Sequence, residues 1–140
     1  MKVLILSGPS GCGKSTWAKA RASRSDARIF SADDYMISDG IYRFEPALLF
    51  EAHPWCFKNF MDIGLRGSHA LVIVDNTNTS AVEISPYYLA AQAYGYEAEI
   101  VRFEGEIHPN VHGTPDYKVQ EQNKRFLTRD VMPWWTVTTA

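Results

Sequence analysis

The sequence predicts an α/β fold in which a parallel β-sheet carries helices on both faces. Three observations lead to this prediction. Short apolar runs typical of buried strands, such as residues 2–7 and 70–75, alternate with longer segments of helical periodicity. A glycine-rich loop at residues 8–15 joins the first strand to the first helical segment. Helical connections between successive strands favour a parallel sheet, in which ligands bind at the carboxyl ends of the strands.

Each element has its own local signal. The predicted strands are short and apolar: residues 2–7, 28–31, 70–75, 97–103 and an edge strand at 136–139. The predicted helices are residues 15–24, 45–63, 85–94 and 116–128, with a loop at 105–115. Glu45-Pro46 opens the second of them, Ser80 and Glu83 suit a capping box ahead of the third, and Ser85-Pro86 begins the main part of that third helix. Gly95 ends it.

Length and composition indicate one soluble domain spanning residues 1–140. The chain is 46% hydrophobic and 21% charged, which is ordinary for a globular protein with a buried core. Its formal charge of −2 supplies no global field for nucleic acid, so a polynucleotide would need a local basic surface. No signal-peptide pattern follows Met1, and no apolar run approaches the roughly 18 residues that a membrane span needs. We therefore expect a cytoplasmic protein without membrane contact.

The most specific motif is a complete phosphate loop, G-x-x-x-x-G-K-[ST], at residues 8–15. In such a loop consecutive backbone N–H groups surround phosphate oxygens, the lysine reaches the β and γ phosphates and the final hydroxyl ligates Mg²⁺. The motif predicts nucleoside triphosphate binding with ATP and Mg²⁺. The predicted nucleotide-binding residues of the loop are Gly8, Ser10, Gly11, Cys12, Gly13, Lys14 and Ser15.

Carboxylates follow two of the predicted strands. Asp33 and Asp34 come directly after the second strand, so they should emerge at the same sheet edge as the phosphate loop. We assign Asp33 as the base that accepts the proton of an attacking hydroxyl, and the alternative is that both residues cap the following turn. Asp75 ends the third apolar strand, where it could hold Mg²⁺ together with Ser15, directly or through water.

These residues resemble the polynucleotide-kinase-like P-loop kinases, the group that includes the 5′-kinase domain of phage polynucleotide kinase. The resemblance is carried by the phosphate loop with Thr16-Trp17-Ala18, by residues 31–35 and 74–79, and by residues 111–115. It implies a P-loop kinase fold with a helical lid that includes residues 112–115. It also implies that Asp33 is the general base and that Thr16 joins the nucleotide contacts. The candidate substrate residues are Asp34, Tyr35, Arg43, Asn76 and Asn78.

The chain departs from that family at two cationic positions. Met36 stands where the family places an arginine after Asp-Asp-Tyr, and Pro109 stands where the lid arginine is expected. Because cationic clamps contribute strongly to phosphoryl transfer, another cation must replace them in an active kinase. Arg125 is the first candidate catalytic cation, followed by Arg43 and Lys118, although surface cations with no such role are the alternative.

Two further features of the sequence each have two possible interpretations. His53 lies beside aromatic residues in the second helix and is either a structural histidine or a substrate contact. Trp134 and Trp135 either anchor the chain end to the core or stack on a base, and we favour anchoring.

The function predicted from the sequence is an ATP-dependent kinase that transfers the γ-phosphate to a nucleic-acid hydroxyl. The resemblance implies a 5′-hydroxyl end of DNA or RNA as the acceptor. A kinase of a small metabolite or a hydroxymethylated base would use the same phosphate chemistry, and the near-neutral charge suits a small acceptor. The missing arginines also leave open a nucleotide-binding module with weak ATPase activity. The sequence leaves the oligomeric state undetermined.

Overall fold

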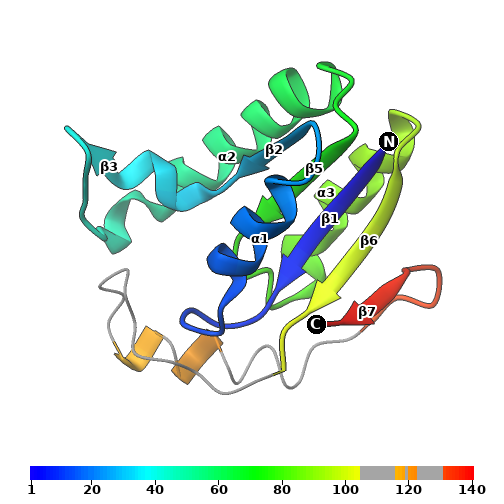
Figure 1. Cartoon of the computed structure of the whole chain (residues 1–140). Helices are drawn as coiled ribbons and strands as arrows, with labels where there is room; N and C mark the ends of the chain where they lie inside the picture. The colour runs from blue at the N-terminus through cyan, green and yellow to red at the C-terminus, as the bar shows by residue number, and fades with distance from the viewer. Residues whose placement is uncertain (105–115, 119, 123–130) are drawn as a thin grey trace.

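The computed structural model describes residues 1–104, 116–118, 120–122 and 131–140. Its main sheet is parallel throughout, with five strands in the order β2–β5–β1–β6–β7 (Figure 1). The strands are β1 (Lys2–Ser7), β2 (Ala27–Phe30), β5 (Leu71–Asp75), β6 (Glu97–Arg102) and β7 (Val137–Thr139). Every strand predicted from the sequence is present, with its bounds shifted by at most one residue at either end. β7 lies at the sheet edge, as predicted.

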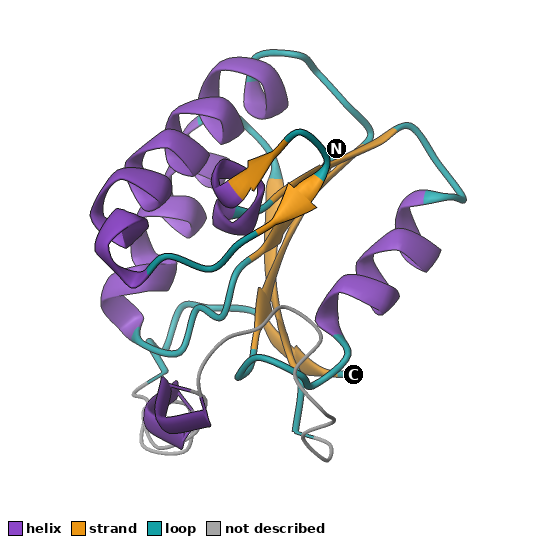
Figure 2. Cartoon of the chain, turned by 90° about the vertical axis from the view of Figure 1, so that its left-hand side faces the viewer, coloured by secondary structure: helices purple, strands orange, loops and turns teal. Residues whose placement is uncertain are grey.

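Helices cover both faces of this sheet, as the edge-on view in Figure 2 shows. They are α1 (Lys14–Ala22), α2 (Leu49–Asn59) and α3 (Ala81–Ala93); a 3₁₀ turn, η2 (Pro46–Leu48), precedes α2 and a π-helical turn, η3 (Phe60–Leu65), follows it. Alternate residues of β1 face opposite ways, as the strand period of two requires. Val3 and Ile5 pack in the core beneath α2 and α3, whereas Leu4 and Leu6 pack beneath α1. The predicted α/β fold is therefore confirmed.

The third helix begins earlier than its Ser85-Pro86 signal indicated. α3 starts at Ala81, because Ser80 Oγ accepts the backbone N–H of Glu83 at 3.4 Å and caps the helix. The Glu83 carboxylate accepts the Thr79 N–H at 2.7 Å, a variant of the capping box. Pro86 consequently lies inside the helix. Its missing N–H removes one hydrogen bond near the N-terminus, where the cap offsets the loss.

A small antiparallel hairpin, absent from the sequence prediction, follows the second strand. The 3₁₀ turn η1 (Ala32–Met36) leads into β3 (Ile37–Ser38) and β4 (Ile41–Tyr42). Asp39 and Gly40 connect these two strands with φ angles of 52° and 76°. Two positive φ angles at an Asp-Gly pair are typical of a tight hairpin turn, so the sequence does carry this signal. The hairpin brings Tyr42 back towards η1.

The chain end is anchored through one of its two tryptophans. Trp135 is buried and its ring lies 5.9 Å from that of Tyr88, whereas Trp134 is 66% exposed. Residues 116–118 and 120–122 are helical, consistent with the predicted helix at 116–128. The predicted loop at 105–115, the lid residues 112–115 and the candidate cation Arg125 lie outside the described residues. Among the helices that the structure describes, none has the length and apolarity to cross a membrane.

Candidate active site

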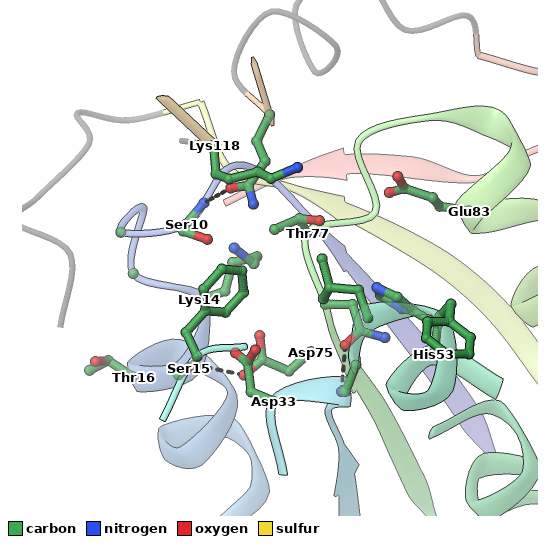
Figure 3. Close-up of a pocket in the computed structure, with 18 of the residues that line it drawn as sticks. Ser10, Lys14, Ser15, Thr16, Asp33, His53, Asp75, Thr77, Glu83 and Lys118 are labelled. Atoms are coloured by element: carbon green, nitrogen blue, oxygen red, sulfur yellow. Dashed lines mark hydrogen bonds between the residues drawn. The ribbon is translucent and has the colours of Figure 1, made fainter. Parts of the chain in front are cut away.

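A pocket of about 670 Å³ opens where the parallel strands β1, β2 and β5 reach their carboxyl ends. Figure 3 shows side chains from several elements converging on it. The lining residues are Ser10, Gly11, Gly13, Lys14, Ser15, Thr16, Ala32, Asp33, Phe44, Leu49, Phe50, His53, Pro54, Asp75, Asn76, Thr77, Glu83, Lys118 and Gln122. All the predicted nucleotide-binding residues except Gly8 and Cys12 are among them. The position agrees with the general rule for ligands of parallel α/β sheets.

The phosphate loop is curled around the ammonium of its own lysine. Lys14 is only 7% exposed, and its Nζ donates to the carbonyl oxygens of Gly8 at 2.9 Å and Pro9 at 3.0 Å. Gly13 has a φ of 91°, a conformation that favours glycine, and it forms the N-terminal boundary of α1. Gly8 has no room for a side chain, since a Cβ there would lie 2.8 Å from the Cys12 sulfur. These two glycines therefore allow the tight course of the loop.

Ser15 and Asp75, the two predicted magnesium ligands, contact each other. Ser15 Oγ donates to Asp75 Oδ2 at 2.8 Å (Figure 3). Asp75 is 8% exposed, at the end of β5 beside the phosphate loop. Hydroxyl and carboxylate oxygens are the donors that Mg²⁺ prefers, so the pair fits this ion. Within the described part of the chain, no cluster of three or more His, Cys, Asp and Glu suits a metal.

Asp33 enters the pocket from the turn η1. Ser31 Oγ caps that turn by accepting the Asp33 N–H at 3.2 Å, and the Tyr42 hydroxyl donates to Asp33 Oδ1 at 3.2 Å. Figure 3 shows Asp33 beside Ser15 and Asp75. Asp34 does not line the pocket. Its pKa is raised, because the carboxylate loses hydration and because Asp33 and Asp75 are negatively charged neighbours. The geometry thus separates the two adjacent carboxylates.

The other candidate substrate residues have different surroundings. Asn76 lines the pocket, but its Oδ1 accepts the Ala32 N–H at 2.8 Å and so supports the turn that carries Asp33. Asn78 is 2% exposed, and its amide donates to the Leu6 carbonyl at 2.8 Å. Tyr35 donates to Glu51 Oε2 at 2.9 Å. Neither Tyr35, Arg43 nor Asn78 lines the pocket, and their substrate roles remain predictions.

Several lining residues were not predicted as site residues. One side of the pocket is mostly apolar, and we call it the apolar wall: Phe44, Leu49, Phe50, His53 and Pro54. These residues belong to no motif. The sequence signal that could have indicated them is the pair of aromatic residues on either side of Glu45-Pro46, namely Phe44 and Phe50. His53 is exposed on α2 and lines the pocket, which favours the substrate-contact interpretation over the buried structural one.

The helical segment at residues 116–122 contributes two polar side chains to the pocket. Lys118, one of the candidate cations, lines it and lies 3.7 Å from the Glu121 carboxylate. Gln122 Oε1 accepts the backbone N–H of Ser10 at 2.9 Å (Figure 3). Ser10 belongs to the phosphate loop, so this hydrogen bond joins the 116–122 segment to the loop.

Comparison with known sequences identifies a family and a relative of this chain. A family model described as "AAA domain" matches residues 3–106. NEDD4-binding protein 2 from Homo sapiens is 33% identical over 96 residues. The match covers 68% of this chain but only 5% of that protein, so the chain spans a small part of this curated relative.

Solved structures share the fold at low sequence identity. A chain of the Pnkp1/Rnl/Hen1 RNA repair complex superposes with a TM-score of 0.70 at 17% identity, covering 91% of this chain and 44% of that one. A sugar kinase from Janibacter sp. HTCC2649 gives 0.67 at 13% identity, covering 100% and 84%. Kti12 from Chaetomium thermophilum, solved with ADP-AlF3, gives 0.67 at 15% identity, covering 99% and 88%. At such identities the likeness concerns the fold alone.

Proposed function

The chain belongs to the AAA domain family and has a P-loop kinase fold, and on that premise we propose that it is an ATP- and Mg²⁺-dependent polynucleotide kinase that phosphorylates 5′-hydroxyl ends. One observation carries the proposal. A single pocket joins the phosphate loop, the Ser15–Asp75 pair and the carboxylate of Asp33. A kinase needs these three parts together: a phosphate cradle, a metal position and a proton acceptor facing the second substrate.

The phosphate end of the pocket supplies most of the electrostatic stabilisation. The loop N–H groups and the Lys14 ammonium are placed to hold the β and γ phosphates, in exchange for the carbonyl contacts that Lys14 now makes. Ser15 and Asp75 would hold Mg²⁺, whose charge offsets the negative charge of the transferring group. Neither role requires the chain to form a covalent intermediate.

Asp33 is the residue that acts on the acceptor. In the proposed reaction the acceptor oxygen bonds to the γ-phosphorus while the bond from that phosphorus to the ADP oxygen breaks, and Asp33 takes the hydroxyl proton. The Tyr42 hydroxyl and the cap by Ser31 hold the carboxylate and its backbone in place. Orientation of this kind contributes because the reacting atoms must meet in line.

Transfer to a small hydroxyl acceptor is a second candidate. The charged side chains that line the pocket within the described residues are Lys14, Lys118, Asp33, Asp75 and Glu83. Carboxylates outnumber ammonium groups in that set, and the whole chain has a formal charge of −2. A long phosphodiester backbone gains little electrostatic binding energy from such a surface. A small neutral acceptor loses no binding energy to it.

The deciding experiment incubates the protein with γ-labelled ATP, Mg²⁺ and a panel of acceptors: 5′-hydroxyl DNA, 5′-hydroxyl RNA, strands whose sole free hydroxyl is at the 3′ end, nucleosides and simple sugars. Lys14→Ala is the matched inactive control. Label on 5′-hydroxyl strands supports the main proposal, and label confined to nucleosides or sugars supports the second. ADP release without label on any acceptor would contradict both and favour a weak ATPase module.

A further inference from the structure

The apolar wall leaves the ring of Phe50 open, whereas two other rings of α2 pack against neighbouring rings. On the same part of the chain, Trp55 lies 5.5 Å from the ring of Tyr35, and Phe57 lies 5.0 Å from that of Tyr87. Among the residues that the structure describes, no second ring pairs with Phe44 or Phe50. Phe50 is 75% exposed although it lines the pocket. Exposed apolar surface beside a polar site is typical of a ligand-binding groove.

The charge of the wall restricts what it can bind. The charged residues of the pocket come from the phosphate loop, η1, β5, α3 and residues 116–122, and the wall contributes a single titratable side chain, His53. A phosphate group or a carboxylate would lose its hydration here without a fixed cation in exchange. A flat, neutral ring system loses little hydration and gains a stacking contact with an aromatic side chain. The wall therefore suits a planar heterocycle better than a charged backbone.

The wall also lies on the acceptor side of the pocket. The Tyr42 hydroxyl reaches Asp33 Oδ1 at 3.2 Å, and Phe44 follows Tyr42 by two residues. The helix α2, which carries Leu49, Phe50 and His53, packs against the turn η1, which carries Asp33. In a nucleoside the 5′-hydroxyl and the base sit on the same sugar ring. A base on the wall would thus leave its own 5′-hydroxyl close to the carboxylate that accepts the proton.

We propose that the apolar wall, through Phe50 above all, stacks on the terminal base of the acceptor, so that the protein selects ends that carry a base over abasic ends. The inference rests on the proposed function for the identity of the acceptor. It adds a specificity determinant outside the substrate residues predicted from the sequence, and it explains how a pocket with few cations can hold a nucleic-acid end. Stacking tolerates all four bases, because every base has a flat face.

The test compares two 5′-hydroxyl oligonucleotides that differ in one feature, a normal terminal nucleotide or a tetrahydrofuran abasic residue at that position. Dissociation constants are measured by titration into protein saturated with Mg²⁺ and a non-hydrolysable ATP analogue. The proteins are wild type, Phe50→Ala, Phe50→Trp and the control Trp134→Ala, which removes an exposed ring that does not line the pocket. Phe50 is exposed, so its replacement should leave folding intact, which melting curves check.

We expect wild type and Trp134→Ala to bind the base-bearing end about tenfold or more tightly than the abasic end. Phe50→Ala should abolish most of that preference, and Phe50→Trp should keep it. Equal dissociation constants for the two ends in wild type, or an unchanged preference in Phe50→Ala, would overturn the inference. Transfer assays with γ-labelled ATP in place of the analogue, on the same protein preparations and oligonucleotides, separate the two proposals. A base preference in binding without transfer supports the wall assignment and contradicts the kinase function. Transfer to both ends with no base preference supports the kinase function and contradicts the wall assignment.

Discussion

The two ends of the pocket are built in opposite ways. At the phosphate end, Lys14 and Asp75 are nearly buried, and their polar atoms are held by hydrogen bonds of 2.8 to 3.0 Å within the chain. At the acceptor end, the apolar wall comes from short turns and the start of α2, and Phe50 is 75% exposed. The first end is buried, charged and hydrogen-bonded, whereas the second is open and mostly apolar.

The difference reflects what each end has to do. Stabilising a charged transition state requires dipoles and charges that are already oriented, because reorienting them during the reaction would raise the barrier. Such groups need the central strands β1 and β5 as a support. An acceptor gains most of its binding from desolvation of apolar surface, which an exposed ring supplies on contact. Changes at the phosphate end should therefore impair the chemistry with every acceptor, and changes at the wall should depend on the acceptor.

The largest effect is expected at the phosphate end, from Lys14→Ala. Loss of the ammonium removes a direct contact to the transferring phosphates, so transfer should fall by about 100-fold to 1,000-fold or more, and ATP binding should weaken. Steady-state kinetics and nucleotide titration measure both quantities. Lys58→Ala, at an exposed position on α2 that does not line the pocket, is the control. Normal ATP affinity and activity in Lys14→Ala would mean that the phosphates bind elsewhere.

The Ser15–Asp75 contact predicts strong non-additivity. Ser15→Ala and Asp75→Asn should each lower turnover by about tenfold or more and raise the Mg²⁺ concentration needed for half-maximal activity. Because both side chains serve one metal position, the double variant should be little worse than the poorer single variant. A double-mutant cycle with Mg²⁺ titrations measures this coupling. Two effects that simply multiply would contradict a shared site.

A smaller effect is expected where the two ends meet, from Tyr42→Phe. This change removes the hydroxyl that donates to Asp33 Oδ1 but keeps the ring, so turnover should fall by about tenfold while the KM for ATP and the melting temperature stay the same. Tyr94→Phe is the control, because its hydroxyl also makes a side-chain hydrogen bond, accepted from Arg66, outside the pocket. Equal kinetic effects of the two variants would show that Tyr42 does not position Asp33.

The smallest effect concerns Gln122, whose side-chain oxygen accepts the Ser10 N–H. If that oxygen occupies a position meant for phosphate, ATP must displace it on binding. Gln122→Ala should then bind ATP about twofold to tenfold more tightly, the range that one neutral hydrogen bond supports. Calorimetric titration measures the affinity, with Gln120→Ala on the same segment as the control. Weaker ATP binding in Gln122→Ala would instead make the glutamine a nucleotide contact.

The sequence predicted the phosphate end far better than the acceptor end, for a physical reason. The loop at residues 8–15 and the buried runs of β1 and β5 are local patterns, and a parallel sheet brings their carboxyl ends together whatever the rest of the chain does. This was enough to place Ser15, Asp75 and Asp33 in one pocket. The spacing of apolar residues along the sequence also distinguished the strands from the helices.

The acceptor end depends on contacts between irregular segments, which no periodic pattern encodes. The hairpin β3–β4 was missed although Asp39-Gly40 signals its turn, and without it the approach of Tyr42 to Asp33 cannot be foreseen. Asn78 also makes a contact that its place in a polar motif does not predict. It is buried with a φ of 45°, and its amide donates to the Leu6 carbonyl of β1. Its substrate role stays a prediction.

The central claim is that Asp33 is the proton acceptor that links the two ends. It is tested most directly by single-turnover transfer from γ-labelled ATP to a 5′-hydroxyl strand, with ATP affinity measured on the same samples of wild type, Asp33→Asn and Asp34→Asn. Asn keeps the shape of the side chain but cannot take the proton. We predict that Asp33→Asn transfers about 100-fold to 10,000-fold more slowly with nearly unchanged ATP affinity, and that Asp34→Asn, whose side chain does not line the pocket, is much less impaired. Essential Asp34 and dispensable Asp33 would contradict the account.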